Sequence, residues 1–113
     1  SPLAFGHLTG KYLADPQAVG RLTLWAEFGQ RYTKPNVRPA TAAYVALARD
    51  HGLTPTQLAL AFVRSRWFVA STILGASTCA QLEENLAAVA TPLSAELLAA
   101  IDAIHLQFTN PAP

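Results

Sequence analysis

The chain has 113 residues, of which 51% are hydrophobic and only 13% are charged, and its formal net charge is +1. This length permits one domain with a buried core, and the near-neutral charge excludes the basic surface that nucleic acid or an anionic membrane would need. Because a charged share of about 25% is usual, we expect apolar surface that faces more protein, with an alanine-rich coding bias as the simpler alternative.

The first third of the chain predicts little regular structure. Residues 1–4 are interpreted as the end of a strand that runs into a turn, and residues 6–12 as a helical turn that Asp15 and Pro16 stop. Prolines and glycines recur through residues 13–39 too often for a long regular element. We therefore expect a long loop there, with one short helix near residues 22–28, and loops of this length are usually functional or mobile.

Two helices are expected next. Residues 40–51 carry an apolar stripe and end at Gly52, a common helix stop. Thr54 then predicts an N-cap, with Pro55 at the first helical position and Gln57 completing a capping box. This second helix is expected to continue to about residue 66. Its expected inward side chains are Leu58, Ala59, Phe62 and Val63.

The last part of the chain predicts a strand and two more helices. Residues 67–74 are short, β-branched and aromatic, which favours a buried strand. Thr78 is predicted to cap a helix that Pro92 breaks, and Ser94 to cap the last helix. Two strands separated by helices indicate a parallel sheet. Because two parallel strands need neighbours, we expect the chain to be part of a larger fold. The expected inward side chains of these helices are Leu82, Leu86, Val89, Leu97, Leu98, Ile101 and Ile104.

Two turns predict a nucleotide site. After the apolar run ends at Gly75, small hydroxylated residues lead into an amphipathic helix. Backbone N–H groups at a helix start bind phosphate, and glycine permits close approach. Residues 1–12 form a second turn of similar character. We interpret the two turns as two walls of one nucleotide site.

These residues resemble a known family. Residues 1–12 (SPLAFGHLTGKY) resemble the seventh-strand segment of the aldo-keto reductases, and residues 75–85, with Gln81, Glu84 and Asn85, resemble their eighth-strand cofactor loop. The resemblance covers almost the whole chain and is strongest to the bacterial branch related to potassium-channel β subunits. It implies an α/β fold class: the C-terminal part of a (β/α)8 TIM barrel, strands 7 and 8 with their helices, mostly helical as a fragment.

The resemblance implies one C-terminal fragment over residues 1–113. Residues 1–39 would hold the end of strand 7 and a long cofactor or substrate loop. Residues 40–113 would hold helices, strand 8 and the C-terminal helices.

The resemblance also implies NADP as the cofactor and a set of residues that bind it. Arginine offers a fork matched to phosphate, and asparagine offers a donor and an acceptor to an adenine edge. Gly75 and Gln81 stand where many classical members have Lys and Arg, which lowers the positive charge available to distinguish NADP from NAD. The implied contacts are Ser1, Pro2, Leu3, Ala4 and Gly6 with the pyrophosphate and ribose, Lys11 and Arg21 with the phosphates, Gly75, Ser77 and Gln81 with the 2′-phosphate, and Glu84 and Asn85 with adenine.

No catalytic residue is predicted. The family's Tyr, Lys, Asp and His lie in the first half of its sequence, and none maps onto this chain. We therefore expect a fragment that is inactive alone and no metal ligands, with NADP(H) and a small carbonyl substrate as partners of the full-length parent. Two alternatives stay open: a helical interaction module, since residues 54–66 loosely resemble a helix-turn-helix, and a regulatory chain that completes a barrel with another subunit.

Location and assembly are also predicted. The single cysteine, Cys79, cannot form an internal disulfide, which favours a reducing, cytoplasmic setting. No apolar run reaches the ~18 residues of a membrane span, and no signal peptide is visible. The absence of methionine indicates a processed or trimmed chain. We expect the fragment to self-associate through the exposed edges of its two strands.

Overall fold

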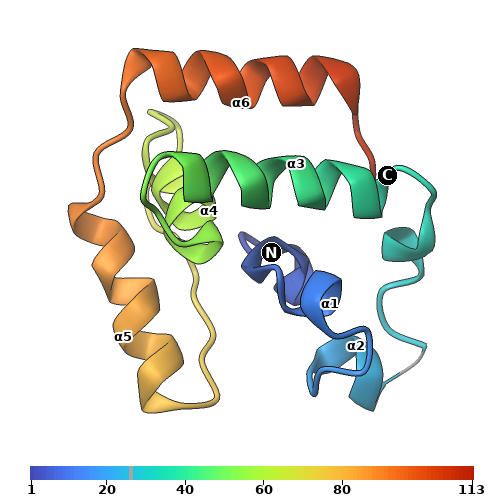
Figure 1. Ribbon diagram of the computed structural model, residues 1–113. Helices are drawn as coiled ribbons and strands as arrows, with labels where there is room; N and C mark the ends of the chain where they lie inside the picture. Colours follow the sequence, from blue (N-terminus) through green and yellow to red (C-terminus); the bar gives the residue numbers. More distant parts are fainter. Residues whose placement is uncertain (26) are drawn as a thin grey trace.

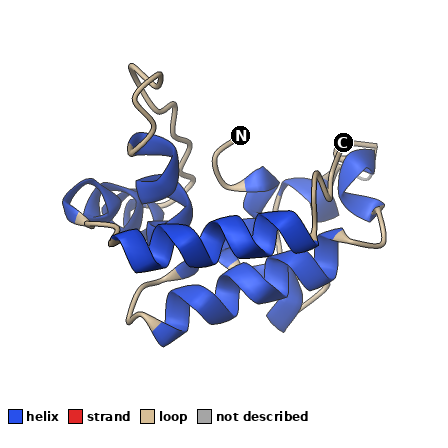
Figure 2. Ribbon diagram, turned by 90° about the horizontal axis from the view of Figure 1, so that it is seen from above, coloured by secondary structure: helices blue, strands red, loops and turns tan. Residues whose placement is uncertain are grey.

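The computed structural model describes residues 1–25 and 27–113, and these residues form helices, turns and loops without a strand (Figure 2). The mostly helical character expected of the chain is therefore confirmed. The elements in chain order are η1 (Ala4–Thr9), α1 (Lys11–Ala14), α2 (Arg21–Leu24), η2 (Gln30–Thr33), α3 (Val37–Asp50), α4 (Pro55–Arg64), α5 (Cys79–Ala87), η3 (Ala88–Ala90) and α6 (Ala95–Gln107), where η marks a 3-10 helix.

The core lies where α3, α4 and α6 meet. The two longest helices, α3 and α6, run side by side, with α4 packed against α3 (Figure 1). Ala48 of α3, Leu58 of α4, and Leu97 and Ile101 of α6 form one buried cluster, and half-buried apolar side chains surround it. The helical periodicity that predicted an inward face on each of these helices is thus confirmed at these four positions.

Helix starts follow the local signals in the sequence. The Thr54 hydroxyl accepts a hydrogen bond from the Gln57 N–H at 3.1 Å, and the Gln57 side chain accepts one from the Thr54 N–H at 2.9 Å. Thr78 and Ser94 cap α5 and α6 in the predicted way. These caps satisfy N–H groups that a helix leaves without partners. Helix α3 begins three residues earlier than expected, because Pro39 is tolerated in its first turn.

The prediction of a buried strand over residues 67–74 is wrong. This segment has no regular structure, and it leaves Trp67 94% exposed and Ile73 86% exposed. The expected strand end at residues 1–4 is a turn that leads into η1. The reason is physical: a strand exists only through hydrogen bonds to a neighbour. None of the described residues supplies one, so the predicted parallel sheet is absent.

A second departure concerns α5. Leu82, Leu86 and Val89 were expected to face inward, yet each is about half exposed. Trp67, Phe68 and Ile73 of the preceding segment are exposed as well, so residues 67–89 carry much of the exposed apolar surface. Its presence agrees with the low charged share of the sequence, which predicted apolar surface facing more protein.

The described helices differ from a membrane span in length and composition. Within the described residues, no single helix is long and apolar enough to cross a membrane. The segments Cys79–Ala90 and Ala95–Gln107 pass that test only together, and the chain bends by 116° between them.

Candidate functional site

The first wall, at residues 1–6, is a tight turn of unusual backbone geometry. Ala4, Phe5 and Gly6 are successive residues with φ of 48°, 57° and 95°. The Gly6 N–H donates to the Leu3 carbonyl at 2.9 Å, which closes the turn. A Cβ at residue 6 would lie 3.1 Å from Cε of Lys11. Glycine therefore permits both the left-handed conformation and the close approach of the lysine.

Two predicted cations flank this turn. The Lys11 ammonium donates to the Val19 carbonyl at 3.1 Å and lies 4.9 Å from the ring centroid of Tyr12. Arg21, at the start of α2, is exposed, and its Cζ lies 5.1 Å from the ring centroid of Phe5. The structure thus brings the predicted residues of the first wall, 1–6, together with both cations.

The second wall, at residues 75–85, consists of the loop before α5 and the first turns of that helix. Two side-chain amides hold the loop. The Ser77 N–H donates to Oε1 of Gln81 at 2.7 Å, and Nδ2 of Asn85 donates to the Gly75 carbonyl at 3.3 Å. Because a backbone N–H can only donate and a carbonyl can only accept, both amides have a fixed orientation. Among the described residues, no hydrogen bond engages the amino group of Gln81 or the carbonyl oxygen of Asn85.

The members of this second wall differ in exposure. Gly75, Ser77 and Gln81 are exposed, and apart from the two chain neighbours of Gly75 no described residue lies within 4 Å of a Cβ built there. Glu84 is half-buried, whereas Asn85 is only 3% exposed. A ligand can therefore reach the loop directly, while the main contact of Asn85 in this structure is with the loop itself.

Asn85→Ala is expected to loosen residues 75–78 and to lower the free energy of unfolding by about 1–2 kcal/mol, because the Gly75 carbonyl loses a buried donor. Hydrogen exchange of the amides in residues 75–78 measures the loosening, and urea unfolding measures the stability. Glu83→Gln, at an exposed position of the same helix, is the control. Equal exchange in the two variants would contradict the bracing role of Asn85.

The two walls form separate clusters in this structure. Helix α4 packs against both η1 and α5, and Figure 1 shows it between the N-terminal segment and α5. None of the hydrogen bonds among residues 1–25 and 27–113 joins residues 1–6 to residues 75–85. The cations lie only beside the first wall, whereas the second wall offers backbone and amide groups, and the predicted single site made of both walls is not assembled in this structure.

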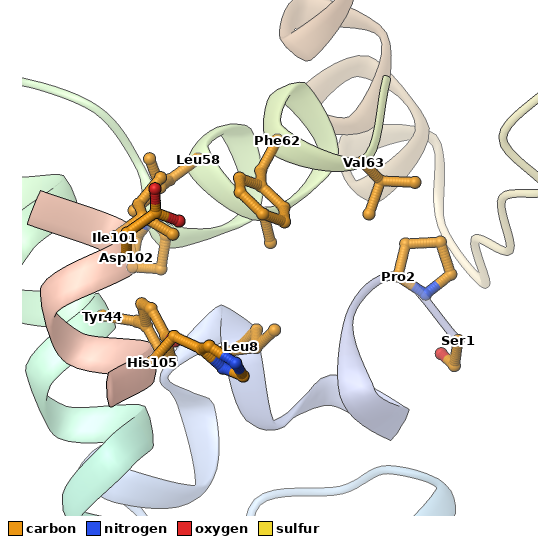
Figure 3. A pocket seen from close by; sticks show the side chains of 12 residues that line it. Ser1, Pro2, Leu8, Tyr44, Leu58, Phe62, Val63, Ile101, Asp102 and His105 are labelled. Carbon is orange, nitrogen blue, oxygen red and sulfur yellow. The ribbon is translucent and has the colours of Figure 1, made fainter. Parts of the chain in front are cut away.

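A cavity of about 440 Å³ lies beside the first wall, between α3, α4, α6 and the chain start (Figure 3). Its lining is largely apolar, including Leu58 and Phe62 of α4. Asp102 and His105 of α6 add a carboxylate and an imidazole to the lining, and Tyr44 has its pKa raised by burial and by Asp102. Sequence reasoning missed this cavity, because the spacing within each helix carries no information on the gap between helices. Within the described ranges, no group of three or more His, Cys, Asp or Glu residues is placed to hold a metal ion.

His7 is a further residue that the sequence did not single out. Its ring lies between two tyrosines, with centroids 5.3 Å from Tyr12 and 4.9 Å from Tyr32, and residues 1–25 and 27–113 supply no hydrogen-bond partner to its buried Nε2. Burial lowers the pKa of His7 below its ordinary value of 6.5. A charge at Nε2 would be both desolvated and unpaired, so the neutral ring is favoured.

The free energy of unfolding is expected to fall as pH drops below about 6.5, because there the unfolded chain binds a proton that folded His7 binds less readily. The contribution of His7 is complete above pH 6.5 and is lost as pH falls through the lowered pKa of the folded state. Urea unfolding between neutral and mildly acidic pH measures it. His7→Gln should flatten the dependence and exposed His105→Gln should not; the same slope in both variants would contradict the assignment.

Comparison with known proteins adds a family and several relatives. The model of the "Aldo/keto reductase family" matches residues 1–106. The chain is 51% identical over its whole length to "Protein tas" of Escherichia coli (strain K12), of which it covers 33%. It is 38% identical to an "Aldo-keto reductase" of Babesia bovis over 76% of the chain and 31% of that protein.

A third relative carries the name of the potassium-channel β subunits, to which the bacterial branch named from the sequence is related. The chain is 39% identical to a "Putative voltage-gated potassium channel subunit beta" of Schizosaccharomyces pombe, over 96% of the chain and 33% of that protein. The chain thus spans about a third of the length of these curated relatives.

Proposed function

Because the chain belongs to the aldo/keto reductase family, we propose that it is the NADP(H)-binding part of an oxidoreductase that reduces aldehydes or ketones. The observation that carries this proposal is the match of the family over residues 1–106, which includes both walls. The family's parent fold is a TIM barrel, in which loops after strands 7 and 8 and a helix N-terminus commonly bind phosphate.

Each wall has a proposed role toward the cofactor. Residues 1–6 would line the pyrophosphate and ribose, with Lys11 and Arg21 supplying positive charge. The loop at residues 75–77 and the amino group of Gln81 would donate to the 2′-phosphate. Asn85 and Glu84 would contact adenine, for which Asn85 must turn its side-chain oxygen outward. Bound NADPH would supply the hydride.

Catalysis itself is proposed to depend on residues outside this chain. The family's proton-donating Tyr and its Lys, Asp and His partners map to no position in residues 1–113. The role proposed for this chain is therefore to hold and orient the cofactor, and on its own it should reduce no carbonyl. We propose NADP rather than NAD because residues 75–81 offer hydrogen-bond donors to the 2′-phosphate. Gly75 and Gln81 add no positive charge there.

A chimera tests the proposal. The matching third of Protein tas is replaced by this chain, which aligns over its full length at 51% identity. The chimera is expected to bind NADPH, measured by quenching of its tryptophan fluorescence, and to oxidise NADPH when an aromatic aldehyde is added. The 113-residue chain alone is expected to show no oxidation. A folded chimera that does not bind NADPH would overturn the proposed function.

The strand edges expected to mediate self-association do not form in the described residues, so we propose instead that the 113-residue chain self-associates through its exposed apolar side chains. Trp67 and Ile73 are almost fully exposed, and the near-zero net charge offers little repulsion between copies. Light scattering during gel filtration is expected to give a mass above 12.0 kDa that falls toward the monomer value on dilution. Ile73→Lys should shift the chain to monomer, and Val19→Lys, at another exposed site, should not. A monomer at high concentration would contradict this.

A further inference from the structure

Phe5 has a backbone conformation that phenylalanine seldom adopts. Its φ of 57° and ψ of 27° lie in the left-handed region, which costs a residue with a Cβ about 1–2 kcal/mol. Such a conformation persists only where the surroundings hold it. Here two aromatic rings of the following loop do so, with centroids 6.3 Å (Phe28) and 5.4 Å (Tyr32) from the ring of Phe5.

The ring held in this way is next to a cation. Cζ of Arg21 lies 5.1 Å from the Phe5 centroid, within the roughly 6 Å over which a guanidinium is attracted to an aromatic face. A guanidinium that stacks on a ring keeps its in-plane N–H donors available. Arg21 is also exposed, so these donors are accessible to an incoming anion.

We propose that Phe5 is a positioning residue that holds Arg21 beside the turn at residues 4–6, ready for the phosphates of the cofactor. This inference rests on the proposed function, in which residues 1–6 and Arg21 bind the pyrophosphate. Phe5 itself makes no polar contact with phosphate. Its effect passes through Arg21, because the ring restricts a long side chain that would otherwise lose its conformational freedom on binding.

Affinity for NADPH in the chimera tests the proposal through a double-mutant cycle. Arg21→Gln is expected to weaken binding about 10-fold or more, as for loss of a charge-assisted hydrogen bond. Phe5→Leu should weaken it roughly 3-fold, since it removes the ring but keeps the charge. The double variant should bind as weakly as Arg21→Gln alone, because Phe5 acts only through Arg21. Phe5→Tyr, which keeps the aromatic face, should restore normal affinity.

Phe108→Leu provides the control. Phe108 is the C-cap residue of α6, outside both walls and outside residues 1–106, which the family model matches. Its loss should leave NADPH affinity unchanged, and thermal unfolding of every variant checks that the fold is intact. The inference alone would be overturned if the fold-losses of NADPH affinity in the two single variants multiplied in the double variant. It would also be overturned if folded Phe5→Leu bound NADPH with unchanged affinity. An unsubstituted chimera without NADPH binding would overturn the proposed function as well.

Discussion

Leu58→Ala should reduce the free energy of unfolding by about 2–5 kcal/mol, because the leucine side chain is buried where α3, α4 and α6 meet. Small domains are stable by only about 5–15 kcal/mol in total, so this one change removes a large share. The loss combines the transfer of the side chain out of water with the cavity that its removal leaves.

Urea unfolding followed by helical circular dichroism measures this effect. Leu106→Ala is the control, since Leu106 is 78% exposed on α6 and its truncation should change stability by no more than about 0.5 kcal/mol. A similar loss in both variants would mean that the three-helix cluster is not the core.

Gly29→Ala should detach the loop that contains α2 and η2 from the N-terminal turn. Gly29 has φ of +88°, and a Cβ there would overlap Cδ2 of Leu22 and lie 3.3 Å from Cδ2 of Tyr32. The strained backbone alone costs about 1–3 kcal/mol, and the overlap forces Leu22 and Tyr32 to move. Because Tyr32 also holds the ring of Phe5, the turn at residues 4–6 should become mobile too.

Limited proteolysis measures this second effect, with faster cleavage expected within residues 15–36. Gly75→Ala is the matched control for stability, because Gly75 has open space around its Cβ position and no left-handed φ. Unchanged cleavage in Gly29→Ala would show that the loop does not depend on this close contact.

The sequence predicted those parts of the fold that depend on neighbours along the chain. The cap at Thr54, with Pro55 and Gln57, involves residues no more than three positions apart, and so do the caps at Thr78 and Ser94. The stop at Gly52 is equally local. Such signals act wherever the segment lies, so they transfer directly from sequence to structure.

The strand at residues 67–74 could not be predicted in the same way. β-branched and aromatic residues show that a segment suits a sheet, but a sheet needs partner strands, and residues 1–25 and 27–113 form none. The left-handed conformation of Phe5 was also missed, because residue type predicts such a conformation only for glycine, asparagine and aspartate. The rings of Phe28 and Tyr32 that pack on Phe5 lie 23 and 27 positions further along the chain, too far for a local signal.

The sequence predicted which two sets of residues form the walls, but it did not predict the hydrogen bonds within each set. Family resemblance named Gln81 and Asn85 as ligand contacts, whereas their hydrogen bonds to Ser77 and Gly75 depend on how the loop folds back onto α5. A sequence motif specifies which groups are present, and the folded backbone decides which of their atoms are already engaged.

The unpaired segment at residues 67–74 also affects how the polypeptide is connected. It is the link between α4 and α5, yet α6 beyond it returns to pack against α3 (Figure 1). A backbone break within this link would therefore produce two pieces that stay bound to each other through the core at Ala48, Leu58, Leu97 and Ile101. The same property makes the link a suitable place for new termini or for an inserted reporter domain.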